Sequence, residues 1–308
     1  MTIENAQYLG LVNPGTSLTY SFTCSGNNRR LYVGVMGAIN SLLISGVTYN
    51  GVAMTFIDRI QVTSDRWIYL YELINPATGA NNIVISASSS TAISGIAIQF
   101  AGARQTTAID NYTKGTANSA TSITQSLTPT KDNAHLLMFV KNGAGSAPAA
   151  GTGSTLQASG GNLSMFTAGP ISPAASTSMQ ATGTSANWAA IIASIAPIIA
   201  ATVTTSAASA ISYNQATGNG NVTDDGGATV TERGFVLATT SNPTTSDTKF
   251  VISGTTGSFS GAMTGLAPLT TYHYRAFATT SEGTVYGADQ SFDTIAESRG
   301  KLSLLGVG

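Results

Sequence analysis

The chain has 308 residues, 42% of them hydrophobic, which is enough for two domains with cores of ordinary size and excludes disorder over the whole length. Charged residues make up only 9%, and the 13 basic and 14 acidic residues are scattered and give a net charge of −1. Nucleic-acid binding needs clustered Lys and Arg to neutralise phosphates, so this composition argues against DNA or RNA as a partner. Cys24 is the only cysteine, which excludes an intrachain disulfide and a thiolate metal cluster.

The first eight residues show neither the basic stretch nor the apolar stretch of a secretory signal. The weakly charged, Ser-, Thr- and Asn-rich composition is nevertheless typical of an extracellular surface. We therefore expect a protein that is synthesised in a host cytoplasm and displayed on the surface of a virion released by lysis. The longest apolar run, Trp188 to Ala201, is shorter than the about 20 residues of a membrane helix and contains Pro197, so we expect a buried strand and a linker rather than a membrane span.

Short β-type runs alternate with turn clusters from residue 18 to residue 197, and no helical period persists there. The clearest local signal is Asn50-Gly51, because both residues accept the positive φ angles of a type I′ hairpin turn. Further strands are predicted at residues 83–87, 93–100, 134–140 and 188–195, whereas residues 144–161 are loop-like. The pattern predicts an all-β first domain, a jelly-roll-like two-sheet sandwich over residues 1–198 that anchors or oligomerises the protein.

Residues 66–73 form the most aromatic predicted strand of this domain. Its apolar side chains alternate between two faces, with Ile68 and Leu70 on one and Trp67, Tyr69, Tyr71 and Leu73 on the other. Because both faces are apolar, we expect the strand to lie centrally in the sandwich. Trp67, Tyr69 and Tyr71 have two interpretations. Core packing is favoured, since sandwich cores use alternating aromatic residues, and a platform that stacks on glycans is the alternative.

Three segments of the first domain, residues 46–54, 65–71 and 193–197, resemble β-sandwich domains of uncharacterised proteins in tailed phages and bacteria. The resemblance implies a sandwich fold and carries no family activity.

The most specific pattern in the chain lies at residues 265–278 and predicts a tyrosine corner. Leu266, Pro268, Thr270 and Tyr272 recur at every second residue. Pro268 fixes the turn, so Tyr272 can bury its ring while its hydroxyl reaches the backbone at the corner of the sheet.

With residues 230–236 and 283–287, this corner resembles that of a fibronectin type III or immunoglobulin-like sandwich. The resemblance implies seven short strands over residues 199–294 and a module for display and binding rather than chemistry. The linker before it, residues 197–204, is short and restricts relative motion of the two domains.

Catalytic and metal-binding patterns are scarce. His135 and His273 each sit in a strand pattern, which favours structural roles. Asp224 and Asp225 precede two glycines, so turn formation explains them, with a calcium site as the alternative. No nucleophile elbow or phosphate-cradling loop occurs, and the scarcity of acids disfavours a glycan hydrolase with its paired carboxylates. We therefore expect a protein that is not an enzyme and needs no metal or cofactor.

These observations predict a non-enzymatic structural protein on the outside of a tailed bacteriophage, as a capsid decoration, a head fibre or a tail-associated protein. Its expected partners are other virion proteins and further copies of itself, with weak multivalent contacts to cell-surface glycans. The alternative is a bacterial extracellular carbohydrate-binding module or adhesin, in which the second domain is a spacer.

The last fourteen residues, 295–308, form an apolar tail with no evident place in either core. An apolar tail is either disordered or buried against something else, and burial by adding an extended strand to a neighbouring subunit is favoured. The side chains expected to take part in assembly are Leu302, Leu304, Leu305 and Val307.

Deletion of residues 301–308 should therefore leave both sandwiches folded and abolish assembly. The measurement is incorporation of the truncated chain into its particle, with circular dichroism as the control for folding. Incorporation at the level of the full chain would refute the assembly role of the tail.

Overall fold

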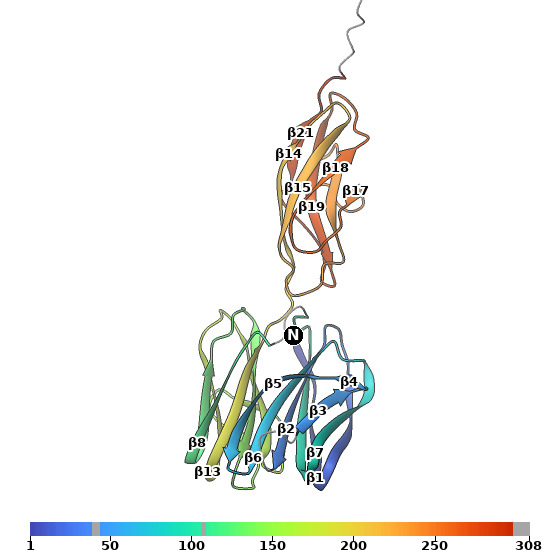
Figure 1. Ribbon diagram of the computed structural model, residues 1–308. Coiled ribbons are helices and arrows are strands. Elements are labelled where there is room, and N and C mark those ends of the chain that lie inside the picture. The colour runs from blue at the N-terminus through green and yellow to red at the C-terminus, as the bar shows by residue number, and fades with distance from the viewer. Residues whose placement is uncertain (39–43, 106–108, 298–308) are drawn as a thin grey trace, which may run out of the picture. The chain divides into compact units, whose positions relative to one another are not determined.

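The computed structural model describes residues 1–38, 44–105 and 109–297, which form strands, turns and bends with no helix among them. The all-β prediction is confirmed. The chain divides into two compact units, Met1–Ile198 and Ile199–Gly308, and each is described by itself below. Figure 1 labels many of the strands of each unit.

The first unit is built from strands β1 to β13. Their bounds are β1 (Thr2–Cys24), β2 (Arg30–Ala38), β3 (Ile44–Tyr49), β4 (Val52–Ala53), β5 (Thr55–Thr63), β6 (Arg66–Ile74), β7 (Gly79–Ala101), β8 (Asn111–Leu127), β9 (Ala134–Asn142), β10 (Ala149–Ala150), β11 (Thr155–Gly160), β12 (Leu163–Ile171) and β13 (Thr177–Ile195). They form one sheet in the order β4-β3-β7-β2-β6-β5, with β1 also on β7, and a second in the order β10-β13-β9-β12-β11, with β8 also on β13.

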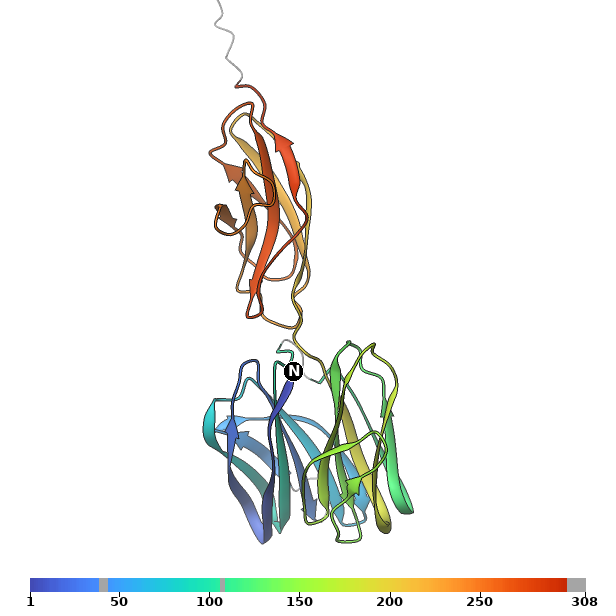
Figure 2. The same ribbon diagram turned by 180° about the vertical axis from the view of Figure 1, so that it is seen from behind.

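The two sheets repeat one strand order. In the first sheet β1, β7, β2, β6 and β5 pair in succession, and in the second β8, β13, β9, β12 and β11 do the same. The registers coincide too, as one row of opposed residues shows in each sheet: Gln99, Leu31 and Leu73 in the first, and Ser194, Leu136 and Ala168 in the second. We call residues 1–101 the first repeat and residues 111–195 the second repeat. Seen from behind in Figure 2, the two repeats, blue to teal and green to yellow, lie side by side.

The two repeats pack on each other through the same face of each sheet. Tyr32 and Met36 of β2 contribute to this interface, as do Leu137 and Phe139 of β9. At its centre the ring of Phe139 occupies the space where a side chain at Gly34 would be, since a Cβ there would lie 2.6 Å from the ring. Gly34 and Phe139 hold equivalent positions in the two ladders, so the repeats are related by an approximate two-fold axis that passes between them.

Each sheet also encloses a core on its other face. The strands β7 and β13 are long, with 23 and 19 residues. In each repeat a second cluster of buried side chains packs on the face of the sheet away from the interface. It contains Val33 and Tyr49 in the first repeat, and Met138 and Trp188 in the second. The central position of β6 between β2 and β5, with apolar faces on both sides, is as predicted. The first unit is therefore a sandwich of two sheets in which each sheet also folds over a core of its own.

The first unit has more strands than the sequence predicted, and several of the predicted strands are longer than expected. Residues 83–87 and 93–100 belong to one strand, β7, and the polar stretch between them pairs with β1 at Thr91, with a shift of register on each side. The loop-like residues 144–161 contain β10 and β11, and the last strand, β13, begins at Thr177. The hairpin at Asn50-Gly51 is present, with φ angles of 50° and 77°.

The second unit is a fibronectin type III-like sandwich. Its strands are β14 (Thr202–Ser209), β15 (Gln215–Asp224), β16 (Glu232–Ala238), β17 (Thr248–Val251), β18 (Gly257–Thr264), β19 (Thr271–Thr280), β20 (Gly283–Tyr286) and β21 (Gln290–Asp293). One sheet runs β14-β15-β18 and the other runs β17-β16-β19-β20, with β21 also on β19. The second sheet has five strands, but β20 and β21 pair with successive parts of β19 and together take the place of one strand, so the order matches the three strands against four of the fibronectin type III sandwich. The core contains Phe235, Met263 and Tyr274.

The tyrosine corner lies where the sequence places it. The hydroxyl of Tyr272 accepts the backbone N–H of Ala267 at 3.0 Å, and its ring stacks on Phe292. Leu266 is buried in the core, and Pro268 is exposed in the turn before β19. The apolar tail at Leu302, Leu304, Leu305 and Val307 lies outside the described residues.

A buried lysine interrupts the interface between the repeats. Lys141 is 1% exposed and holds the position that Met36 has in the first repeat. Its ammonium donates a long hydrogen bond of 3.4 Å to the carbonyl of Asn142. Burial and, to a smaller extent, the neighbouring Arg66 lower the pKa of Lys141 to about 7, with Asp65 opposing the change. In the unfolded chain the amine returns to its ordinary value, so between about pH 7 and pH 10 the unfolded state binds more protons and stability rises with pH.

Replacing Lys141 with Met, the residue of the first repeat, should stabilise the first unit by about 1–4 kcal/mol at pH 6, because an apolar side chain of similar volume needs no desolvation. The gain should shrink toward about pH 10, because the amine is then neutral in the folded state and only its charged form is penalised by burial. Urea unfolding of the full chain at the two pH values measures it, and an equal gain at both would contradict a buried ammonium as the cause.

Candidate functional site

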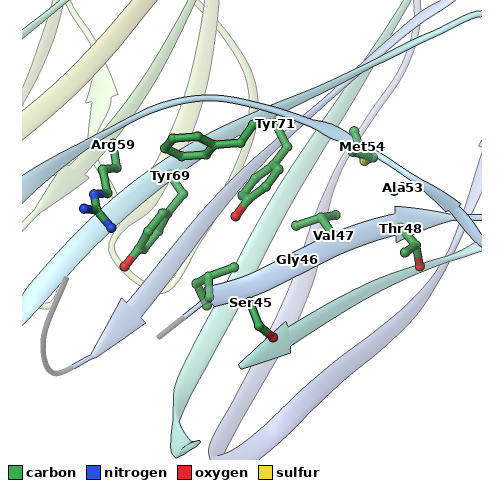
Figure 3. A pocket seen from close by; sticks show the side chains of 11 residues that line it. Ser45, Gly46, Val47, Thr48, Ala53, Met54, Arg59, Tyr69 and Tyr71 are labelled. Atoms are coloured by element: carbon green, nitrogen blue, oxygen red, sulfur yellow. The ribbon is translucent and has the colours of Figure 1, made fainter. Parts of the chain in front are cut away.

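A cavity opens over one face of the first sheet, between strand β3 toward one end of the strand order and strands β5 and β6 at the other end. Its volume is about 580 Å³, within the about 300–1,000 Å³ of small-molecule sites. Figure 3 shows the eleven described residues that line it. We call it the β3/β6 cavity. Val47 and Met54 close one side with buried apolar side chains, and Ser45 lies exposed at the opening.

Aromatic rings of β5 and β6 form the opposite side of the β3/β6 cavity. Tyr69 and Tyr71 are 2% and 5% exposed, whereas Phe56 on the rim is 48% exposed and lies 5.5 Å from the ring of Tyr71. In Figure 3 the phenol hydroxyl of Tyr71 points toward β3, into the space that the cavity occupies, and the ring of Tyr69 lies beside that of Tyr71. Burial raises the pKa of Tyr71 to about 12, with Tyr69 adding to the rise and Arg59 opposing it. Its phenol therefore stays protonated and can donate a hydrogen bond.

Arg59 brings the one positive charge among the described lining residues of the β3/β6 cavity. Its guanidinium lies 5.4 Å from the ring centroid of Trp67, which lies two residues before Tyr69 on β6, and Tyr69 is the residue opposite Arg59 in the ladder. A cation over an aromatic face is attracted by the ring and loses rotational freedom there. The lining thus combines an exposed aromatic rim, two buried hydroxyl donors and a positioned guanidinium.

The sequence places aromatic residues at this site but does not identify all of it. Of the three candidates for glycan contact, Tyr69 and Tyr71 line the cavity, and Trp67 lies behind Arg59. Phe56 and Arg59 were missed, because residues 55–63 were not predicted as a strand. The alternation of apolar and polar side chains in that segment is weak, and the ladder with β6 decides its structure.

A second polar cluster lies buried at the interface between the repeats. Glu72 accepts hydrogen bonds from Arg30 and from the hydroxyl of Tyr32, the latter at 2.7 Å, and its other oxygen accepts the backbone N–H of Ile109 at 3.2 Å. Arg30 also donates to the carbonyl of Arg104. Burial and then the neighbouring Glu72 hold the pKa of Tyr32 well above its usual range, so the phenol remains a donor. The cluster thus ties the segment between β7 and β8 to the first sheet.

The remaining candidates have structural partners. His273 bonds to Asp289 at 2.7 Å on the outer face of β19, and His135 packs against Phe100, where burial lowers its pKa. The carboxylates of Asp224 and Asp225 each accept a backbone N–H two residues ahead, as turn formation predicts.

Two searches of the described residues for special sites gave no candidate. Within residues 1–38, 44–105 and 109–297, no three His, Cys, Asp or Glu side chains gather as metal ligands would. Nor does that part of the chain contain a helix long and apolar enough to cross a membrane.

Comparisons with known proteins do not assign a family. No family model matches the chain, and no curated protein matches it. Among solved structures, the sensor domain of the anti-sigma factor RsgI4 from Pseudobacteroides cellulosolvens is 21% identical and covers 32% of this chain and 98% of its own, with a TM-score of 0.25. Domains A168–A170 of titin are 11% identical and cover 96% of this chain and 97% of their own, with a TM-score of 0.26.

A viral protein is also among the similar structures. The major capsid protein P2 of bacteriophage PM2 is 8% identical and covers 62% of this chain and 97% of its own, with a TM-score of 0.24. Scores at this level carry no argument about function. The fold assignment above rests on strand order and register.

Substituting Glu72 with Gln should destabilise the first unit by about 3–5 kcal/mol, because it leaves the buried guanidinium of Arg30 without its counter-charge. The matched control is Glu232→Gln in the second unit, whose pair with Lys249 is about one-third exposed and should contribute less than about 1 kcal/mol. Urea unfolding measures both variants. Equal small losses would show that the buried pair stabilises no more than a surface one.

Proposed function

We propose that this protein is a non-enzymatic structural protein on the outside of a tailed-phage particle, as a capsid decoration, a head fibre or a tail-associated protein. The first unit anchors or oligomerises the protein among other virion proteins, and the second unit is the display module. The protein is made in the host cytoplasm and acts on the virion surface.

The observation that carries this proposal is the duplicated sandwich of the first unit. Two repeats of one strand order share a single apolar interface, which gives a rigid body whose buried side chains are used for packing. Double-sheet sandwiches are recurrent building blocks of viral shells, and fibronectin type III-like sandwiches are recurrent display modules. The weakly charged composition supports a surface that meets cells through many weak contacts.

The second candidate is a bacterial extracellular carbohydrate-binding protein or adhesin. The β3/β6 cavity favours it, because an aromatic rim with hydroxyl and guanidinium donors suits a sugar ring. In this candidate the cavity is the principal site, whereas in the leading one it assists attachment of a particle.

The location of the protein separates the two candidates. Particles are purified on a density gradient from a lysate of cells that carry the gene in its natural genome, and a gold-labelled antibody against the second unit is applied to them. We expect the label on the outside of intact particles and the chain among their proteins by mass spectrometry, with pre-immune serum as the control. Recovery of the chain only from cell envelopes or culture medium would overturn the virion proposal and support the adhesin.

A further inference from the structure

Strand β8 is a free edge of the second sheet. It pairs with β13 on one side, and the part of the chain that the structure describes places no strand on its other side. Figure 1 shows it at the outer edge of the first unit, beside β13. Alternate backbone N–H and C=O groups of an edge strand point away from the sheet. They can therefore form a ladder with one further strand.

The edge of the first repeat is protected against such pairing, whereas the equivalent part of β8 is not. Natural sheets discourage further pairing with bulges and charges on their edge strands. The equivalent strand, β1, shifts its register between Ile3 and Asn5 and again between Tyr8 and Gly10, and Glu4 lies in the first of these shifts. In β8, residues 111–117 pair with β13 over seven successive residues without a shift.

The one charged residue of β8 does not protect this edge. The ammonium of Lys114 donates to a carboxylate oxygen of Asp58 at 2.8 Å and to the carbonyl of Arg59 at 3.0 Å, both on β5 of the first repeat. The side chain is therefore held against the first repeat, and its charge is balanced there. The other residues of β8 are uncharged.

A second uninterrupted edge, residues 17–24 of β1, already has side chains bonded to its backbone. The carbonyl of Phe22 accepts the hydroxyl of Tyr49 at 3.2 Å, and the carbonyl of Thr23 accepts the side-chain amide of Asn5 at 3.0 Å. Among the described residues, no side chain bonds in this way to the backbone of residues 111–117. Of the two edges, β8 is the more open to a new strand.

A second copy of the chain suits this edge. Across a two-fold axis β8 pairs antiparallel with itself, which continues the ladder of β13 and β8 into the second copy. Small, uncharged side chains such as Thr113 and Thr116 can lie opposite one another without repulsion. The net charge of the chain is only −1, so two copies repel each other little. Tyr112, which is 43% exposed on β8, would be covered by the added strand.

We infer that two copies of this protein associate through antiparallel pairing of their β8 strands along residues 111–117. This inference rests on the oligomerising role proposed for the first unit and names the surface that performs it.

The first test measures the mass of the full chain by sedimentation velocity over a range of concentrations, together with hydrogen–deuterium exchange. We expect an equilibrium between monomer and dimer. The amides of residues 111–117 should exchange more slowly as the dimer forms, because the outward N–H groups then donate to the second copy. Residues 2–10, the equivalent part of β1, should exchange equally at all concentrations. A chain that stays monomeric, or an assembly in which residues 111–117 exchange as fast as in the monomer, would overturn the inference.

The second test uses matched lysine substitutions at two exposed threonines. Thr116→Lys should weaken the dimer by about fivefold or more, because the two-fold axis places the added charge in the contact twice. Thr264→Lys, on β18 of the second unit, makes the same change of net charge and should leave the dimer unchanged. Both variants should unfold at the urea concentration of the natural chain. An equal effect of the two substitutions on the dimer, or none of Thr116→Lys, would contradict the β8 contact.

A third test separates β8 from the apolar tail. The chain without residues 301–308 should still form the dimer in solution, since the tail takes no part in the pairing of β8. Loss of the dimer on this deletion would assign self-association to the tail and overturn the inference.

The outcomes stay separate from those of the virion proposal, because these tests use the purified chain and the gold-labelling experiment uses particles. Particles that lack the protein would refute the virion proposal and leave the pairing of β8 standing. Purified protein that stays monomeric would refute the pairing and leave the place of the protein on a particle standing.

Discussion

The first unit depends on the apolar contact between equivalent faces of two repeats. At the approximate two-fold axis the contact has room for one large side chain, and the ring of Phe139 fills it only because Gly34 has no Cβ. Two phenylalanines would collide and two glycines would leave a cavity, so the repeats must differ at this pair. The two repeats therefore share equivalent backbone ladders but fill the centre of their interface with one large and one small residue.

Buried charged side chains form hydrogen bonds with the backbone of segments that lie outside the β-ladders. Arg30 and Glu72 fasten the segment between the repeats through main-chain atoms of Arg104 and Ile109. In the second unit Arg233 does the same for the loop before β18, donating to the carbonyls of residues 253, 255 and 256 while its guanidinium lies 4.8 Å from the ring centroid of Phe259. With only 9% charged residues, the chain places several of them where irregular backbone carbonyls and amides would otherwise be buried without partners.

The sequence predicted what local physics controls. Asn50-Gly51, the alternation around Tyr69 and the corner at Tyr272 each depend on a few neighbouring residues, and all three features are present. The duplication was not predicted, because the two repeats keep a common ladder while their side chains differ, as Arg59 and Ser159 show. The site was half predicted for the same reason: Tyr69 and Tyr71 have a strong pattern, whereas Phe56 and Arg59 reach the cavity only through pairing between strands.

The difference between the two repeats bears on the proposed function, because it decides how tightly the cavity of the first repeat can hold a ligand. Once the interface between the repeats fixes both backbones, side chains on the far faces can change without unfolding the unit, and the first repeat has an open cavity where a segment covers the second. A half-open cavity offers a ligand few hydrogen bonds and little buried area, so a single copy would bind weakly. Weak sites become effective when a rigid assembly presents many of them to a repeating polysaccharide, because each later contact is intramolecular. Under the proposed function, such a cavity is therefore of use mainly on a protein that a particle or a cell displays in many copies.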